Sequence, residues 1–553
     1  MMNKIFLSWM TVFLLLGTPS VWACTNLLVT KGASTDGSTM ITYAADSHVL
    51  YGELYHWPSA DHAPGEMLQV IEWDTGKFLG EIAQVPHTYN VIGNMNEHQL
   101  AIAETTFGGR KELHDPNGIM DYGSLIYITL QRAKTAREAI QIMTDLVKDY
   151  GYYSSGESFS IADKEEVWVL EMISKGEVEK GAVWVAQRIP DGYISAHANQ
   201  ARITHIDFKD ADNFIYSEDV VEFAIAQGYF SGKKKDFDFS AAYAPLDFGA
   251  VRFCDARAWS IFNRVNPAFG AKYQDYAMGD LSKDRMPLYV KPDALLTVKD
   301  AMELMRDHYE GTPMDMTNDA GAGPSACPYR WRPLTWESEG ATYFNERAIS
   351  TQQTGFSFVS QSRSWLPDAF GGLLWFGVDD TYSTCYTPIY SASTRVPESF
   401  AVGNGDMLTY SETAAFWVFN RVTNFAYMRY DEVIQDIRKL QSELEGKYIK
   451  TIPAIDKAAE ELMKTDTQMA IDFVTDFSVN NADKMVQRWK ELDNYLLVKY
   501  MDGNIKVEEN GKFKYNPSGL MPVNPITKPY SEEYRKKLVE DTKDHLKYPG
   551  QAH

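Results

Sequence analysis

Short runs in which apolar residues dominate or alternate with polar ones recur from residue 25 to residue 198, a pattern typical of β-strands. Two of these runs, residues 25–29 and 38–43, flank a turn with an Asp-Gly pair, which favours a tight reversal of the chain. We therefore expect a β-hairpin that returns the chain to Cys24. Further strands are expected at residues 89–93, 100–105, 158–162, 167–172, 182–187 and 193–198.

Helical spacing appears between these strands. Apolar residues recur every three or four positions over residues 121–150, and Gly151 follows, which predicts one long amphipathic helix. Strands on both sides of a helix favour a layered α+β domain. Another helix is expected at residues 297–309, followed by a Gly- and Pro-rich loop at residues 311–328.

The chain changes character after about residue 410, where long charged segments contain few Gly, Pro or Asn residues. We interpret residues 411–553 as a mainly helical C-terminal region with a tail, and residues 24–410 as the main domain. The helices expected in the C-terminal region are residues 412–421, 430–444, 457–463, 470–500 and 531–543.

The N-terminal segment has the features of a signal peptide. Lys4 precedes an apolar run over residues 5–16, which is shorter than the about 20 residues that span a bilayer as a helix. Residues 21–23 are Val-Trp-Ala and end in the small residue that a signal peptidase prefers before its cut. We expect removal of residues 1–23, export to the periplasm or the medium, and a mature chain that begins at Cys24. Stable membrane insertion is not expected, because no later apolar run is long enough.

Composition and charge narrow the function classes. Hydrophobic residues make up 44% and charged residues 23% of the 553 residues, as in folded globular proteins. The formal net charge of −22 disfavours nucleic acid as a partner, because a polyanion would be repelled. Small substrates are therefore favoured.

The residues that could bind metals have no metal-binding spacing. At most one disulfide can form among the cysteines other than Cys24, and its pair is left open; these are Cys254, Cys327 and Cys385. The adjacent Asp379 and Asp380 would point to opposite faces of a strand, and we expect them at the surface or at the edge of a cleft. The isolated histidines are interpreted as structural or substrate-lining residues, as for His48, His98 and His197.

An N-terminal cysteine would combine two catalytic groups on one residue. Its thiolate is a good nucleophile, and its α-amine, with a reference pKa of about 7.7 to 8.0, can take the thiol proton near neutral pH. The competing interpretation is a lipoprotein cysteine that is acylated after export. Trp22 and Val21 argue against it, because a lipobox normally has a small residue and Leu at these positions. No flexible tether follows Cys24 either.

Residues 24–29 (CTNLLV) and 32–41 (GASTDGSTMI) resemble the start of the cysteine dipeptidases of the N-terminal-nucleophile hydrolase superfamily. Residues 96–98 (NEH), 198–200 (ANQ) and 374–380 (LWFGVDD) resemble further segments of this family. The resemblance implies that the main domain is catalytic and forms a four-layer αββα sandwich, with the nucleophile at the start of a central strand. It also implies hydrolysis of dipeptides of broad sequence, without a metal or an organic cofactor.

The resemblance suggests further site residues on the second hairpin strand. In the related choloylglycine hydrolases and penicillin acylases, an arginine and an aspartate follow the cysteine there. Asp46 matches the aspartate and would orient the Cys24 amine; alternatively, it closes a turn with Ser47. Tyr43 stands where many relatives have the arginine, so that another cation, such as Arg257, would have to lower the pKa of the thiol.

An asparagine completes the oxyanion hole in these relatives, and Asn199 would fill this role. Its amide N–H would stabilise the oxyanion by about 2.7 to 4 kcal/mol. An ordinary turn asparagine is the alternative. Arg257 could bind a substrate carboxylate, lie near the thiol, or form a salt bridge with Asp255 or another acid.

These observations favour an exported dipeptidase that forms a thioester at Cys24 and then hydrolyses it. One alternative is an amidase of the same superfamily that acts on acyl-amino acids, bile-salt conjugates or penicillin-type amides. The other is a lipid-anchored binding protein in which Cys24 is acylated. The expected partners are dipeptides, with the formation of a homo-oligomer left open.

Overall fold

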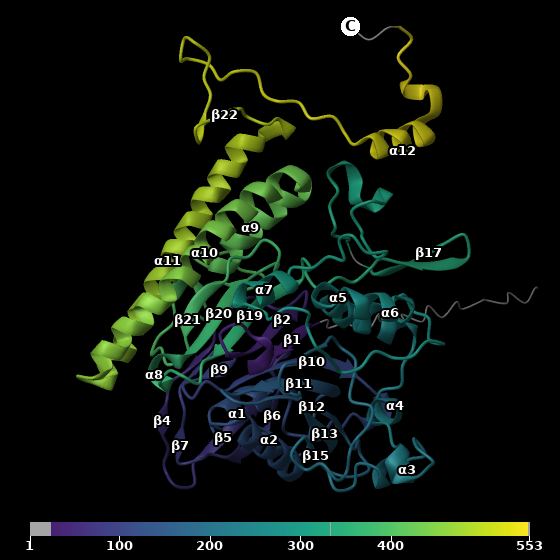
Figure 1. Cartoon of the computed structure of the whole chain (residues 1–553), viewed down its shortest axis with the longest axis vertical. Coiled ribbons are helices and arrows are strands. Elements are labelled where there is room, and N and C mark those ends of the chain that lie inside the picture. Colours follow the sequence, from purple (N-terminus) through teal and green to yellow (C-terminus); the bar gives the residue numbers. More distant parts are fainter. Residues whose placement is uncertain (1–23, 332, 551–553) are drawn as a thin grey trace, which may run out of the picture.

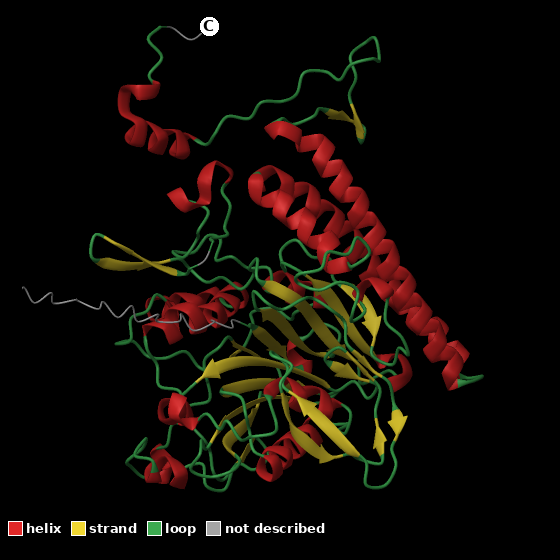
Figure 2. Cartoon of the chain, turned by 180° about the vertical axis from the view of Figure 1, so that it is seen from behind, coloured by secondary structure: helices red, strands yellow, loops and turns green. Residues whose placement is uncertain are grey.

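The computed structural model describes residues 24–331 and 333–550. The predicted signal peptide, residues 1–23, lies outside the described residues. Two antiparallel sheets are stacked in the lower and middle parts of the molecule, and helices cover them (Figures 1 and 2). The protein is therefore an α+β protein, as the sequence pattern predicts.

Seven strands form the first sheet. Their order is β16 (Tyr289–Val290), β14 (Ile194–His197), β1 (Asn26–Val29), β2 (Thr39–Asp46), β19 (Thr354–Ser362), β20 (Gly372–Val378) and β21 (Thr387–Tyr390). Strand β1 pairs with β2 in the register Leu28 to Ile41, which confirms the predicted hairpin. Both strands are buried along their whole length, so that Cys24, just before β1, lies inside the protein.

Eight strands form the second sheet. Their order is β15 (Phe214–Tyr216), β13 (Ala182–Arg188), β12 (Val167–Ser174), β11 (Gly156–Ala162), β10 (Ala101–Gly108), β9 (Met95–Asn96), β8 (Val91–Ile92) and β3 (His56–Trp57). Side chains alternate across it, so that Ala101 and Ala103 face the first sheet and Ile102 faces the helices. The expected strand at residues 89–93 is reduced to β8.

Two helices cover the outer face of the eight-stranded sheet, α1 (Tyr122–Leu130) and α2 (Ala136–Tyr150). The prediction of one continuous helix over residues 121–150 is wrong. A capping box starts the second helix, because the Thr135 hydroxyl accepts the Glu138 N–H and the Glu138 carboxylate accepts the Thr135 N–H. The apolar spacing runs across this break because both helices pack on the same sheet.

The C-terminal helices cover the seven-stranded sheet on its other side (Figure 1). They are α9 (Ala415–Met428), α10 (Tyr430–Met463) and α11 (Thr467–Tyr500). Helix α10 continues through Pro453, so that the two helices expected at residues 430–444 and 457–463 are one. Buried residues of these helices belong to the same hydrophobic cluster as strands β1 and β2. The division of the chain at residue 410 stays a prediction.

The remaining helices and strands lie around this core. The helices are α3 (Glu222–Ala226), α4 (Phe239–Tyr243), α5 (Ala256–Val265), α6 (Pro267–Ala277), α7 (Val298–Leu304), α8 (Asp368–Gly371) and α12 (Glu532–Thr542). The two-stranded pairs are β4 (Ala60–Asp61) with β7 (His87–Thr88), β5 (Met67–Ile71) with β6 (Phe78–Ala83), β17 (Thr335–Ser338) with β18 (Ala341–Phe344), and β22 (Glu508–Glu509) with β23 (Lys512–Phe513). Helix α7 is shorter than the predicted helix at residues 297–309. None of the helices in the described ranges is both long and apolar enough to cross a bilayer.

Candidate active site

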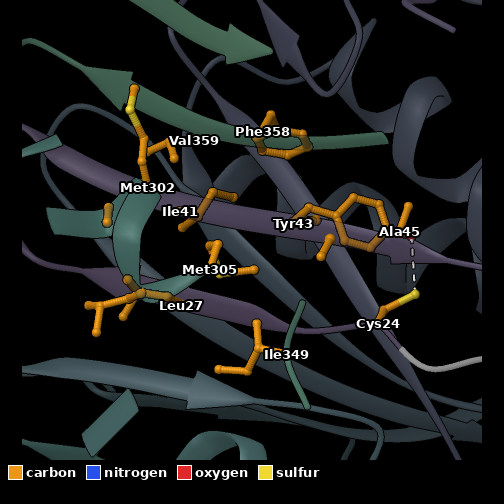
Figure 3. Packing of buried hydrophobic residues seen from close by; sticks show 14 of the residues in the cluster. Cys24, Leu27, Ile41, Tyr43, Ala45, Met302, Met305, Ile349, Phe358 and Val359 are labelled. Atoms are coloured by element: carbon orange, nitrogen blue, oxygen red, sulfur yellow. Dashed lines mark hydrogen bonds between the residues drawn. The ribbon is translucent and has the colours of Figure 1, made fainter. Parts of the chain in front are cut away.

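Cys24 lies where the two sheets meet, with only 4% of its surface exposed. Its Sγ atom is 3.8 Å from the hydroxyl of Tyr43 and 3.6 Å from Oε1 of Glu104. Figure 3 shows Tyr43 on the neighbouring strand, with its ring directed toward the sulfur. Burial, and after it the carboxylates of Glu104 and Asp46, raise the pKa of the Cys24 thiol. The resting sulfur is therefore a thiol rather than a thiolate.

A pocket with an empty volume of about 560 Å³, its mouth included, opens beside this sulfur. Aromatic side chains form much of its wall, among them Trp57, Trp73, Tyr127 and Phe356. The described residues that line it include two carboxylates, those of Asp46 and Glu104, and no Lys, Arg or His. The pocket is thus mainly apolar, with acidic groups close to Cys24.

Asp46 is at the end of β2 and lines this pocket, close to Cys24 as the hairpin predicts. Its Oδ2 atom accepts a hydrogen bond from Arg347 at 2.5 Å, and its Oδ1 atom accepts one from the Thr354 hydroxyl at 2.6 Å. Burial raises the pKa of the Asp46 carboxyl, although Arg347 acts in the opposite direction. Asp46 is therefore held in place by a buried ion pair, and no turn contact with Ser47 is needed to explain its position.

Arg257 and Asn199 are hydrogen-bonded to each other, and Arg257 also contacts the backbone of Cys24. Arg257 belongs to α5, directly after a π-helical turn over Ala250–Asp255, a local geometry that is frequent at functional sites. Its guanidinium donates to the Cys24 carbonyl at 2.6 Å, to the Thr25 hydroxyl at 2.8 Å and to the Asn199 side-chain oxygen at 2.8 Å. Arg257 therefore holds the backbone of the cysteine. Asp255 instead forms ion pairs with two other arginines, Arg202 and Arg285.

Asn199 has φ of 60°, a left-handed conformation that asparagine adopts more readily than most residues. Its side-chain N–H donates to the Thr106 carbonyl at 2.7 Å. Because the amide nitrogen carries two hydrogens, one remains for another acceptor. The oxyanion role of Asn199 stays a prediction.

Three further carboxyl groups extend the acidic character of this region. Glu104 accepts a hydrogen bond from the Tyr43 hydroxyl, and its Oε2 atom is buried without a hydrogen-bond donor in the described structure. Burial, and then Glu104, raise the pKa of Glu157 well above its usual range. Asp74 accepts a hydrogen bond from the Tyr122 hydroxyl at 2.7 Å, and burial raises its pKa to about 7.

Glu104 and Arg347 were not among the residues expected from the sequence. The sequence did contain a signal for Glu104, because it is the one charged residue of a mostly buried strand, and a buried charge is costly unless it has a partner or a function. No sequence signal pointed to Arg347, because it lies 301 positions from Asp46 in an irregular segment.

The other candidate residues occupy positions that suit a structural role. His197 is buried between the hydroxyls of Thr105 and Ser160, each at 2.7 Å, and burial lowers its pKa to about 3. The expected surface position of Asp379 and Asp380 is wrong, because both are buried. All four cysteines are free. Within the described residues, no cluster of His, Cys, Asp and Glu suits a metal ion.

Comparison with known proteins assigns the family. The model of peptidase family C69 matches residues 23–57 and 53–443. The chain belongs to peptidase family C69. This peptidase is therefore a hydrolase of peptide bonds, in agreement with the predicted resemblance and enzyme class.

Curated relatives of the peptidase carry dipeptidase names. It is 26% identical over 460 residues to a probable dipeptidase of Latilactobacillus sakei, which is 79% of this chain and 88% of the relative. It is 27% identical over 399 residues to a probable dipeptidase of Salmonella dublin, with 68% and 82% covered. Dipeptidase A of Lactobacillus helveticus is 24% identical over 400 residues, with 68% and 77% covered.

Proposed function

We propose that the protein is an exported cysteine dipeptidase with an N-terminal-nucleophile fold, in which Cys24 is the nucleophile of the mature chain. The observation that carries this proposal is the position of Cys24 at the start of a central strand, beside a pocket lined by aromatic side chains and two carboxylates. The family match begins at residue 23, directly before this cysteine, and the dipeptidase names of the relatives support the substrate class.

The free α-amine of Cys24 takes the thiol proton, and the sulfur attacks the carbonyl carbon of the first residue of the dipeptide. The amine then passes its proton to the departing amino acid, which leaves a thioester on Cys24. A water activated by the same amine hydrolyses the thioester and restores the thiol. A thiol with a raised pKa needs such a base beside it, because little thiolate exists at neutral pH.

Asp46 would fix the orientation of the α-amine by accepting one of its hydrogens. A carboxylate has about four acceptor positions, and Arg347 and Thr354 take two of them. Arg257 would hold the Cys24 carbonyl, and with it the amine and the sulfur, in a fixed geometry. Asn199 would donate its second amide hydrogen to the oxyanion.

Two observations favour this function over the alternatives. A carboxylate 3.6 Å from the nucleophile offers no favourable contact to a neutral acyl group, whereas it can bind the free amino group of a peptide. In a lipoprotein the cysteine sulfur carries the lipid, but the Cys24 side chain is buried inside the protein.

The test is to prepare the chain with Cys24 as its first residue, verify this by intact mass, and measure dipeptide hydrolysis. Cys24→Ala is expected to abolish turnover. A chain with one alanine before Cys24 keeps the thiol but converts the amine into an amide, and we expect near-complete loss of turnover as well. Dipeptide hydrolysis retained by Cys24→Ala would refute the proposed nucleophile.

A further inference from the structure

We propose that Glu104 binds the free α-ammonium group of the residue whose carbonyl Cys24 attacks, so that the site selects peptides with an unblocked N-terminus. This inference rests on the proposed function of Cys24 as the nucleophile. It assigns a specificity-determining role to a strand residue that is buried and lines the pocket.

The distances place the two charges together. In a reactive complex the attacked carbon lies about 3 to 3.5 Å from the nucleophile. The amino nitrogen of the same residue is two bonds away from that carbon, through bonds of about 1.46 and 1.52 Å. It therefore has to lie within a few ångströms of Cys24 Sγ, and Oε1 of Glu104 is 3.6 Å from that atom. An ammonium group there can donate to Glu104 at the about 2.7 to 2.9 Å of a charged hydrogen bond.

The charges of the pocket wall favour a cation at this point. Asp46 already has a cationic partner, since Arg347 donates to it. Glu104 receives its hydrogen bonds from neutral groups, among them the Tyr43 hydroxyl and the Cys24 thiol, and no cation pairs with it in the part of the chain that the structure describes. A buried carboxylate without a cation is unfavourable, and a bound ammonium group would offset that cost.

Two further carboxyl groups lie on the far side of Glu104 and Tyr122 from the sulfur, and they add to the acidic character of this end of the pocket. The raised pKa of Glu157 holds this group in its protonated form, where it is a hydrogen-bond donor beside Glu104. Asp74, behind Tyr122, adds further negative potential to the same end of the pocket. Of these three carboxyl groups, Glu104 is the one that lines the pocket and lies 3.6 Å from the sulfur.

The α-amine of Cys24 is a second cation that Glu104 could attract, but its function disfavours this pairing. The amine has to be unprotonated to accept the thiol proton, and an adjacent unpaired carboxylate would raise its pKa. Asp46 suits the amine better, because Arg347 offsets its charge. Glu104, with no cation to offset its own charge, suits a group that must stay protonated.

The experiment compares Ala-Phe with propionyl-Phe, which differ only in the amino group. For the wild-type enzyme we expect a kcat/KM at least tenfold higher on Ala-Phe. Glu104→Gln should lower this ratio at least tenfold, because the rate on Ala-Phe falls much more than the rate on propionyl-Phe. Glu104→Asp, which keeps the charge on a shorter side chain, should retain part of the ratio.

Two results would overturn the inference. One is a wild-type ratio of kcat/KM on Ala-Phe to kcat/KM on propionyl-Phe that is near one. This measurement needs no variant, so it tests the inference even if the variants fail to fold. The other is an equal loss on both substrates in a folded Glu104→Gln enzyme, which would assign Glu104 to Cys24 itself. Failure of the proposed function would give a different result. Either the wild-type enzyme would not hydrolyse dipeptides, or Cys24→Ala would still hydrolyse them.

Discussion

The ion pair between Asp46 and Arg347 allows the proposed role of Asp46 to be separated from its structural role. Asp46→Asn keeps the shape of the side chain and an oxygen for the Thr354 hydroxyl, but it removes the negative charge. Arg347 then stays buried, with only 2% of its side chain exposed, and without its carboxylate partner. Breaking a buried ion pair in this way costs about 3 to 5 kcal/mol. We expect the free energy of unfolding to fall by that amount.

The double variant Asp46→Asn with Arg347→Met removes the buried guanidinium as well as the carboxylate. A buried pair can often be replaced by neutral groups of similar volume with little loss, so most of the stability should return. Turnover should not return if Asp46 orients the amine as proposed, because both variants remove that carboxylate. A hydrogen bond to a charged group contributes about 1.5 to 3 kcal/mol, which corresponds to about 10- to 150-fold in kcat.

The assay pairs urea unfolding with dipeptide turnover for each variant. Asp456→Asn is the matched control, since Asp456 also bonds to a buried arginine, Arg363 at 2.5 Å, but belongs to α10. It should lose stability and keep its turnover below the urea transition. If the double variant regains wild-type kcat, Asp46 acts only by neutralising Arg347, and its proposed role in orienting the amine is wrong.

Two further predictions concern buried groups near the strands. Arg257→Met should lower both kcat and the free energy of unfolding. Arg202→Met removes another buried arginine, one that does not contact Cys24, and should lower the free energy of unfolding alone. Equal kcat values in the two variants would contradict a positioning role for Arg257. Burial lowers the pKa of His197 to about 3 in the folded state, against about 6.5 in the unfolded chain. The folded state therefore favours the neutral imidazole. The resulting contribution to stability is complete above pH 6.5 and is lost as the pH falls toward 3. His197→Gln should therefore show a shallower decline of the urea midpoint between pH 7 and pH 5, and an unchanged slope would refute the assignment.

The sequence pattern predicted the centre of the fold better than its periphery. The hairpin of β1 and β2 follows from alternating polarity and an Asp-Gly turn, both of which are local signals. The break at Thr135 was missed because helices α1 and α2 cover one sheet and share one apolar pattern. The continuity of α10 was missed because Pro453 normally ends a helix, whereas here packing against the sheet and α11 maintains it.

The site was predictable only where one residue carried its own signal. Cys24 stands out through its predicted exposure at a processed end, and Asp46 through the return of the hairpin. Arg257 was expected near a substrate carboxylate, the thiol or an acid, but it contacts the Cys24 carbonyl, and no sequence spacing encodes this contact. The pairing of Asp46 with Arg347 depends on the tertiary fold, because nothing local connects residues that far apart.

The surroundings of the Cys24 sulfur have a consequence for its chemical stability. Oxidants and alkylating agents react with thiolates, and a buried thiol held protonated by neighbouring carboxylates offers them little of that form. An ammonium group arriving at Glu104 would cancel part of the negative potential and make the thiol easier to ionise. The thiol would then react slowly in the empty enzyme and would become more reactive when the substrate peptide binds.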